Sequence, residues 1–450
     1  MATETFLRRS PVAAPAEALW DWHLRPGALE RLIPPWERVV VEDPGRGVVE
    51  GSRTVLRVKV GPVSRRWVAE HREVLPGRSF RDVQVRGPFA RWDHRHRVEA
   101  AGPSASVLED RIEWALPLGA LGRLVGARAV RRRLERTFAY RHRTTADDLA
   151  LARRRRGVAP LRVLVTGASG TVGRALVPFL TAQGHAVVPL RRGEPSAERP
   201  SWDPERGRVD LDAAGPIDAV VHLAAAGVAD RRWTDARKAL LRSSRVDATR
   251  LLAEALAHRP LPPRVLVSAS AVGIYGRRDA AETVTEASEP RAGDFLADLA
   301  RDWEEATAPA ERAGVRVVRA RLGVVLTPAG GALPRLLAPF RLGAGGPLGD
   351  GSAGTPWIAI DDVLGAIEHA IATEAVTNRD LARALGRVLR RPSFVRTPAF
   401  ALRLVLGEMA DAVLLSSLHV EPRVLLDTGY RFRFPALAPA LHHLLGRPEE

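Results

Sequence analysis

The stretch LRVLVTGASGTVGRAL, residues 161–176, decides the fold of the larger part of this chain. Its apolar start, 161–165, predicts a buried strand, and a helix is expected over 174–183. Between them stand Gly167, Gly170 and Gly173. A glycine triplet alone is weak evidence of function. With a strand before it and a helix after it, however, the triplet matches the turn that holds a dinucleotide pyrophosphate. The free N–H groups of the helix N-terminus would face the phosphates.

Alternating strands and helices continue beyond the glycine turn. Such alternation predicts a parallel sheet covered on both faces, the doubly wound α/β arrangement of the Rossmann fold. We assign this domain to residues 161–375. Its strands are expected at 161–165, 186–190, 218–223, 264–269 and 315–320.

The end of the second strand indicates the cofactor. AVVPL, 186–190, runs into Arg191 and Arg192, where an acid would bind the ribose hydroxyls of NAD. An arginine there pairs with a 2′-phosphate, which favours NADP over NAD, although Arg192 is also explained as a solvated neighbour. The expected cofactor contacts are Gly167, Ser169, Gly170, Thr171, Val172, Gly173, Arg191, Arg192, Leu223, Ala224, Ala225 and Ser268.

Residues 1–152 have a different pattern, that of an α+β unit. A strand at 5–12 and a helix containing 16–22 precede six short strand-like runs, and a long helix follows at about 120–150. Leu121, Leu124, Val125, Leu134 and Phe138 are spaced along this helix for one apolar face. The order resembles the START-like (SRPBCC) superfamily of polyketide cyclases and lipid-transfer proteins, which implies a curved antiparallel sheet gripping one helix. The six runs are near 37–42, 53–60, 64–74, 79–86, 92–99 and 106–115.

The resemblance implies a ligand-binding domain with an apolar cavity for a hydrophobic ligand. Simple core packing explains its tryptophans equally well. A basic linker at 153–160 and a C-terminal lobe of helices with short irregular pieces at 376–450 complete the predicted organisation. The tryptophans in question are Trp20, Trp22, Trp36, Trp67, Trp92 and Trp114.

Composition excludes several classes of function. The chain has no cysteine, so disulfides and thiolate metal sites are excluded, and we expect no metal. The N-terminus lacks the apolar segment of a signal peptide, and charges interrupt the longest apolar stretch, which predicts a cytoplasmic protein. The net charge is +16, and residues 1–160 carry 31 Lys and Arg against 19 Asp and Glu. A solvated basic face is favoured over a site for nucleic acid or a membrane surface, because no aromatic residues interleave the charges.

Longer strings resemble an atypical extended short-chain dehydrogenase/reductase, specifically the bacterial "epimerase family protein" group, also labelled cell-division-inhibitor-like. They begin with VLVTGASGTVGRAL and continue through nearly all of 161–450, and the group carries a C-terminal domain of unknown function. The strings include DAVVHLAAAG (218–227), RWTDARKALLRSSRVDATRLL (232–252), VSASAVGIYG (267–276), GDFLADLARDWEEA (293–306), RLGVVLTPAGGALPRLLAPFRLGAGGPLGDG (321–351), PWIAIDD (356–362) and RPSFVRTPAFALRLVLGEMADAVLLSS (391–417).

Short-chain dehydrogenases normally use a Tyr-x-x-x-Lys pair that this chain lacks, and the resemblance implies that the related group shares this loss. Leu296 and Ala300 stand near the expected positions. What remains is Ser270, near the family's substrate-binding serine, and Tyr275, which is expected near the nicotinamide or else in packing. These two are the candidate catalytic residues.

Four acids near these strings are expected to have structural roles. Glu304 and Asp298 are interpreted as residues that form ion pairs on the surface or cap a helix. Asp361 and Asp362 are interpreted as loop or helix-cap residues before a helix at 363–372. A shortened segment at 372–375 stands where related proteins have a longer piece with a strand, which puts the wall of the substrate pocket in doubt.

Three functions are compatible with these residues. The first is an NADP-dependent oxidoreductase or epimerase-like enzyme acting on an unknown small molecule. The second is a non-catalytic NADP(H) sensor or scaffold, since the Tyr/Lys pair is missing. The third is a carrier of a hydrophobic ligand in the N-terminal domain. Consumption of the cofactor separates the first from the second, and an extracted lipid or polyketide-like ligand favours the third.

Overall fold

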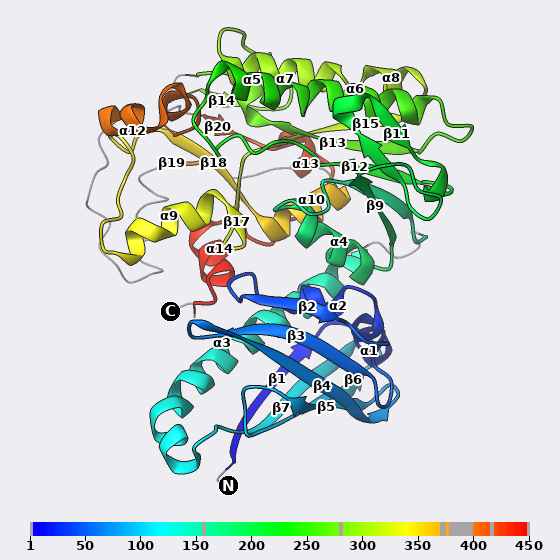
Figure 1. Ribbon diagram of the computed structural model, residues 1–450, viewed down its shortest axis with the longest axis vertical. Coiled ribbons are helices and arrows are strands. Elements are labelled where there is room, and N and C mark those ends of the chain that lie inside the picture. Colours follow the sequence, from blue (N-terminus) through cyan, green and yellow to red (C-terminus); the bar gives the residue numbers. More distant parts are fainter. Residues whose placement is uncertain are drawn as a thin grey trace.

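The computed structural model describes residues 3–154, 159–278, 282–369, 375–377, 399–414 and 418–447. Two lobes lie one above the other (Figure 1), with the N-terminal residues in the lower lobe and the remainder mainly in the upper one. No helix in the described ranges is both long and apolar enough to cross a membrane.

The N-terminal lobe is a helix-grip fold, as the sequence predicted. Seven antiparallel strands lie in the order β1-β7-β6-β5-β4-β3-β2 and curve around the long helix α3 (Gly119–Arg154). Alternation along each strand turns one face inward, for example Val98 on β6 and Leu108 on β7. The strands are β1 (Glu4–Val12), β2 (Val39–Asp43), β3 (Arg53–Val60), β4 (Val63–Leu75), β5 (Ser79–Arg86), β6 (Arg91–Gly102) and β7 (Ala105–Ala115), with α1 (Ala16–Leu24) and α2 (Ala28–Arg31) between β1 and β2.

The apolar face predicted for the long helix is buried only in its second half. Leu134 and Phe138 pack against Phe6 and Ile112. The first turns extend past the end of the sheet, where Leu124 is 84% exposed and Leu121 and Val125 are also exposed. The prediction was wrong for this half because helical spacing shows which residues share a face but not how far the partner sheet extends.

Most of the six tryptophans have aromatic neighbours in the core. Trp20 packs edge-on against Phe80, and Trp67 packs edge-on against Trp92. Trp22 and Trp114 are fully buried. Trp36 instead packs against Tyr140 of α3.

The upper lobe contains the predicted doubly wound sheet. Its order is β11-β10-β9-β8-β12-β13-β15, with β9, β8, β12, β13 and β15 parallel. The chain crosses from β9 on one side of β8 to β12 on the other, which opens a crevice at the carboxyl ends of these strands. The sequence-based strands are confirmed: β8 (Arg162–Thr166), β9 (Ala186–Arg192), β12 (Ala219–His222), β13 (Val265–Ala271) and β15 (Arg316–Leu322), while β10 (Ser201–Asp203) and β11 (Arg208–Asp210) extend the edge.

Helices cover both faces of this sheet, and Figure 1 shows α5–α8 on the side away from the lower lobe. On the near side, α4 and α10 bury Leu176, Phe179 and Val363 in the largest apolar cluster. The helices are α4 (Gly173–Ala182), α5 (Asp235–Ser243), α6 (Val246–Ala257), α7 (Phe295–Glu305), α8 (Ala308–Arg312), α9 (Ala332–Arg341) and α10 (Ile360–His369).

A second, four-stranded sheet has the order β17-β16-β18-β19. β19 pairs antiparallel with β18 at the end of the shortened segment, of which only Ala375 lies among the described residues. The strands of this sheet are β16 (Val324–Thr327), β17 (Gly330–Gly331), β18 (Gly354–Ala359) and β19 (Ala375–Thr377). A separate pair of strands consists of β14 (Thr283–Val284) and β20 (His419–Val420). The C-terminal part adds α12 (Ala399–Leu406), the π-helical turn η4 (Ala410–Leu414), α13 (Arg423–Asp427) and α14 (Leu437–Leu444).

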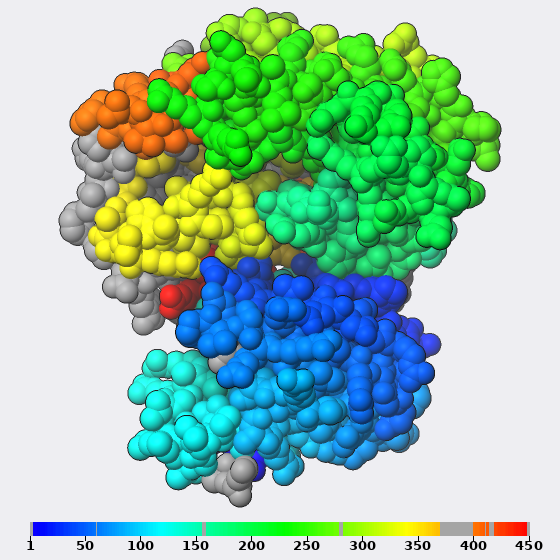
Figure 2. All heavy atoms as spheres, viewed as in Figure 1, coloured from blue at the N-terminus to red at the C-terminus, as the bar shows by residue number. Residues whose placement is uncertain are grey.

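A buried ionic cluster joins the two lobes, which are in broad contact in the space-filling view (Figure 2). Arg31 of α2 lies 3.0 Å from Asp148 of α3 and 2.8 Å from Asp361 of α10. Arg433 approaches Asp148 at 3.1 Å, and His443 of α14 approaches Asp361 at 3.4 Å. All these side chains are nearly inaccessible, so each charge depends on its partners for compensation.

The paired aspartates after β18 therefore have a role that the sequence did not indicate. They lie inside the first turn of α10, which begins at Ile360. Asp361 binds the other lobe, and Asp362 accepts backbone N–H bonds from Arg433 and Phe434. Burial raises the pKa of Asp362 to about 6, and Arg31 holds the pKa of Asp361 far below its ordinary value although burial opposes this. The interpretation as local loop or cap residues was incomplete, since their partners are distant in sequence.

Candidate functional site

The glycine turn has the close backbone approaches that require glycine. Gly167 has φ +67°, and a Cβ on it would lie 2.8 Å from Ala224 N. A Cβ on Gly173 would lie 2.2 Å from Gly167 O. Val172, just before α4, makes no side-chain cap, and Arg174 and Ala175 already donate to Gly170 O and Val172 O, so the N–H groups left for an anion are those of the turn before Arg174. The strand–turn–helix geometry is that of a dinucleotide-binding fold.

A cleft of about 740 Å³ opens beside this turn. Arg191 and Arg192, at the end of β9, line one wall. The helix-grip lobe supplies another wall through Gly27 and Glu30 of the α2 segment, a contribution that nothing in the sequence indicated. The full lining is Gly27, Glu30, Gly167, Ala168, Ser169, Arg174, Val177, Pro178, Thr181, Pro189, Leu190, Arg191, Arg192, Trp202 and Ala224.

A buried hydrogen-bonded chain holds the loop after β12. Thr166 Oγ1 accepts the N–H groups of Leu223 and Ala224, so its own proton goes to His222 Nδ1, 2.7 Å away. His222 Nε2 then donates to Thr249 Oγ1 at 2.9 Å. Burial lowers the pKa of His222 to about 4, so the ring is neutral and can both accept and donate. This chain fixes the backbone against which Gly167 packs.

A second cavity, of about 430 Å³, lies on the other side of that loop. Leu223 and Ala225 line it, whereas Ala224 lines the first cleft, so the two spaces meet at this loop. Most of the second lining is apolar. The polar exceptions that reach it are Arg245, Ser270, Arg277, Asp294 and Thr355.

Ser270 is the polar residue best placed for chemistry in this cavity. Its hydroxyl donates to Glu304 Oε1 at 2.6 Å. Glu304 is in turn held by Arg321, whose Nε and Nη2 each lie 2.9 Å from a carboxylate oxygen. Glu304 was predicted to be a surface or capping residue, and this was wrong: it is buried and ion-paired. Asp298, on the same helix, does make an exposed pair with Arg301.

Tyr275 lies behind the cavity instead of facing it. The residue is 1% exposed and packs with Ile274 and Val284. Its hydroxyl accepts a hydrogen bond from Arg321 Nη1 at 3.1 Å, but burial still raises its pKa above the usual value. This position supports the packing interpretation, and we assign Tyr275 no catalytic role. Ser268 is also buried beneath the surface and lines neither space in the described residues.

Leu296 and Ala300, near the positions expected for the Tyr/Lys pair, both line the second cavity. The wall that would carry those groups is therefore apolar here. The sequence reasoning missed Arg245, which lies just before α6 and is 7% exposed. Burial lowers the pKa of Arg245 to about 10. Its only sequence signal was a cation next to an otherwise apolar helix face.

The comparisons with known proteins divide the chain as its fold does. Residues 12–138 match the family "Polyketide cyclase / dehydrase and lipid transport", residues 163–386 match the "NAD dependent epimerase/dehydratase family", and residues 397–444 match a domain of unknown function, DUF1731.

Three similar proteins cover different parts of the chain. The Epimerase family protein Mb2239 of Mycobacterium bovis is 38% identical over 299 residues, 64% of this chain and 98% of that protein. The crystal structure of a nucleoside-diphosphate sugar epimerase from Corynebacterium glutamicum has a TM-score of 0.80 at 32% identity and covers 98% of this chain and 90% of that one. The human epimerase family protein SDR39U1, crystallised with NADPH, has a TM-score of 0.58 at 34% identity and covers 63% of this chain and 99% of that one. From its glycine turn, its parallel sheet and these likenesses, the chain belongs to the epimerase family proteins, NAD(P)-binding members of the NAD-dependent epimerase/dehydratase family that here carry an N-terminal polyketide-cyclase-like domain.

Proposed function

We propose that this protein binds NADP(H) and uses it in oxidoreductase or epimerase-type chemistry on a small anionic molecule. The observation that carries the cofactor choice is the pair of arginines lining the cleft at the end of β9. Arg191 is exposed and makes no ion pair among the described residues, whereas Arg192 is 3.7 Å from Glu205. A guanidinium binds a phosphate through charge-assisted hydrogen bonds, so Arg191 is the better holder of a 2′-phosphate. The NADPH in the human relative supports the same choice.

The two spaces on either side of the loop Leu223–Ala225 fit the two halves of the cofactor. The adenosine end would occupy the cleft beside Arg191, and the pyrophosphate would lie on the turn at Gly167. The loop Leu223–Ala225 borders both spaces, so the nicotinamide end would reach the cavity that contains Ser270. When bound, NADP(H) supplies hydride exchange at its nicotinamide ring.

Arg245 indicates the class of substrate. Its guanidinium is buried, stacks 5.1 Å from the centre of the Trp303 ring and donates to Leu241 O. Within the described residues it makes no ion pair with a carboxylate, although it lines the cavity. A buried cation without a counter-ion is costly, and a carboxylate or phosphate on the substrate would remove that cost. Apart from Ser270, Arg277, Asp294 and Thr355, the rest of the lining is apolar, which favours a small molecule with an apolar part.

Ser270 and Glu304 provide a path for a proton. Because Ser270 donates its own proton to Glu304, its lone pairs are free to accept a hydrogen bond from a substrate hydroxyl. Loss of that substrate proton would pass one proton to Ser270 and one from Ser270 to Glu304. Arg321 holds the Glu304 carboxylate in place with two hydrogen bonds. This path requires neither Tyr275 nor a lysine.

A second candidate is an NADP(H) sensor without turnover. The observation that favours it is the apolar wall at Leu296 and Ala300, where the catalytic pair of dehydrogenases would stand. It shares the cofactor site but assigns no chemistry to Ser270.

Arg245→Met tests the proposed substrate class. Purified protein saturated with NADPH is titrated with a panel of small aldehydes and ketones that each carry a carboxylate or a phosphate ester. Binding is followed by NADPH fluorescence, and turnover by the oxidation of NADPH. We expect at least one anion to be bound and reduced by the wild type. Its affinity should fall at least about 10-fold in Arg245→Met, because a charged hydrogen bond contributes about 1.5–3 kcal/mol.

Arg242→Met is the matched control, since Arg242 is 53% exposed and pairs with Asp302 on the surface. It should leave the affinity for the anion unchanged. Binding of the anion without any oxidation of NADPH would favour the sensor. Equal affinity in the wild type and Arg245→Met would contradict the assignment of Arg245.

A further inference from the structure

The interior of the helix-grip lobe contains a cluster of histidines and aspartates remote from the nucleotide cleft. Cross-strand register places them side by side: His71, Asp82 and His94 are opposite one another on β4, β5 and β6. His96 is opposite Asp110 on β7. Alternation along the strands turns all of them to the concave face, where polar residues are uncommon.

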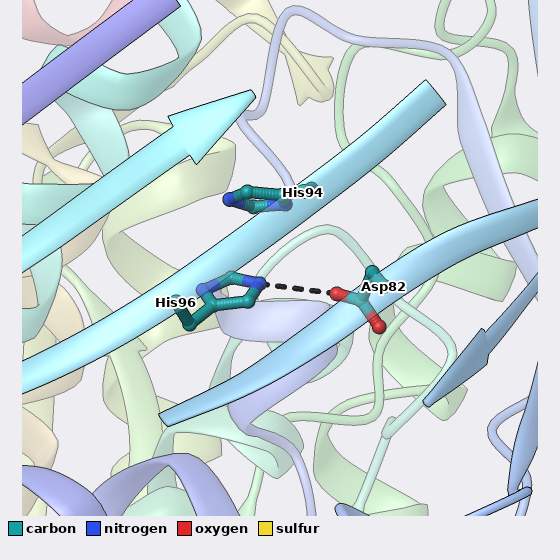
Figure 3. Close-up of side chains that lie close together, drawn as sticks. All are labelled: Asp82, His94 and His96. Atoms are coloured by element: carbon teal, nitrogen blue, oxygen red, sulfur yellow. Dashed lines mark hydrogen bonds and ion pairs between the residues drawn. The ribbon is translucent and has the colours of Figure 1, made fainter. Parts of the chain in front are cut away.

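Three of these residues converge on one point. Asp82 Oδ2 lies 3.0 Å from His96 Nε2, and the rings of His94 and His96 are tilted at 44° to each other with centroids 3.8 Å apart. One potential ligand atom from each of Asp82, His94 and His96 lies within 4.8 Å of the other two. Figure 3 shows the two rings one above the other on a single strand, with Asp82 facing them from its neighbour.

We propose that Asp82, His94 and His96 bind a divalent first-row transition-metal ion of the zinc type. Two imidazoles and one carboxylate are a common ligand set for such ions, and the site needs no cysteine. The ion would use the nitrogen of each ring that faces away from Asp110. Three protein ligands leave a fourth tetrahedral position for water or a small bound molecule.

The surrounding residues form the second set of contacts that such a site needs. Metal-binding histidines usually present their other ring nitrogen to a carboxylate, which fixes the ring. Asp110 Oδ1 lies 2.7 Å from His94 Nε2 and 2.7 Å from His96 Nδ1. His142 of α3 holds the second oxygen of Asp110 at 2.7 Å. One aspartate thus orients both proposed histidine ligands.

His71 does the same for the carboxylate ligand. Its Nε2 lies 2.9 Å from Asp82 Oδ1, while its Nδ1 donates to Gly47 O. Asp82 Oδ2, the oxygen that faces His96, is therefore the one that can bind a metal.

Burial and charge also indicate a bound cation. In the described residues, Asp82 and Asp110 make ion pairs only with histidines; Asp110 is buried, and Asp82 is partly buried with 24% of its side chain exposed. His96 Nδ1 and His142 Nδ1 are buried without an aligned hydrogen bond, although the first is close to Asp110. One divalent ion would compensate the carboxylates and leave the two ligand rings, His94 and His96, neutral, which is the form that binds metals. Sequence reasoning expected no metal because it considered thiolates.

The test uses the full-length, untagged protein. Metal content is measured by mass spectrometry after purification without chelator, and the chelator-treated protein is titrated with Co²⁺ as a spectroscopic probe. We expect one equivalent of bound ion and the intense visible absorption of tetrahedral or five-coordinate Co²⁺. Apparent Co²⁺ affinity should fall at least about 100-fold in His96→Gln and in Asp82→Asn, which lie on different strands, and about 10-fold to 100-fold in Asp110→Asn.

His258→Gln controls for adventitious binding, because His258 is exposed on the other lobe. Far-UV circular dichroism and NADPH binding establish that each variant is folded. The proposal is overturned if chelator-treated wild-type protein shows no such absorption. It is equally overturned if folded Asp82→Asn binds Co²⁺ with wild-type affinity, since the ion would then lie elsewhere.

Discussion

Gly167→Ala is expected to lower NADPH affinity at least about 100-fold, or roughly 2.7 kcal/mol at 25 °C. The added Cβ would lie 2.8 Å from Ala224 N and Leu223 C, both backbone atoms that cannot rotate away. The turn and the loop Leu223–Ala225 must then separate, and this moves apart the two walls between which the cofactor lies. Isothermal titration calorimetry with NADPH measures the loss.

Gly207→Ala is a matched control for backbone strain. Gly207 has φ +65°, nearly that of Gly167, but its added Cβ would meet no atom within 4 Å. Both variants therefore share a cost of about 1–2 kcal/mol for the left-handed backbone, and only Gly167→Ala adds the steric conflict. Affinities that differ less than twofold between the variants would show that the approach of Gly167 to Ala224 is not needed for binding.

Arg31→Met is expected to destabilise the contact between the lobes by about 3–5 kcal/mol. The substitution leaves the carboxylates of Asp148 and Asp361 in the interior without their main cation, and methionine retains much of the side-chain volume. Arg433 and His443 would compensate only in part, since they approach one oxygen each at 3.1 Å and 3.4 Å. Differential scanning calorimetry should show a first unfolding transition at a lower temperature than in the wild type, with the two lobes melting separately.

Arg57→Met serves as the surface comparison. Arg57 pairs with Glu42 on the edge of the lower sheet and is 61% exposed, so its loss should cost less than about 1 kcal/mol. Because α2 also forms a wall of the nucleotide cleft, Arg31→Met should weaken NADPH binding as well. Unchanged melting in Arg31→Met would mean that the buried ionic cluster does not hold the lobes together.

The sequence predicted those features that depend on local pattern. Strand alternation located the seven strands of the lower sheet, and the glycine spacing located the turn at Gly167. It did not predict how far α3 extends past its sheet, because Leu124 has the same helical spacing as the buried Phe138. Whether such a helical residue is buried depends on how far the sheet that packs against the helix extends.

The parts of the site that were missed depend on contacts between distant residues. Glu304 appeared to be a surface acid on α7, and only the parallel pairing of β13 with β15 brings Arg321 and Ser270 to it. Asp361 resembled a cap until Arg31, 330 positions earlier in the chain, was placed beside it. The histidine cluster likewise arises from register across four strands, which no single strand reveals.

The central claim is that the cleft beside Gly167 binds NADP(H), with Arg191 holding the 2′-phosphate. The most direct measurement is a fluorescence titration of the purified protein with NADPH and NADH, with Arg191→Ala beside the wild type. We predict that the wild type binds NADPH about 10-fold to 100-fold more tightly than NADH, and that Arg191→Ala loses most of this preference while its NADH affinity is unchanged. Equal affinity of the wild type for the two nucleotides, or no binding of either, would contradict the account.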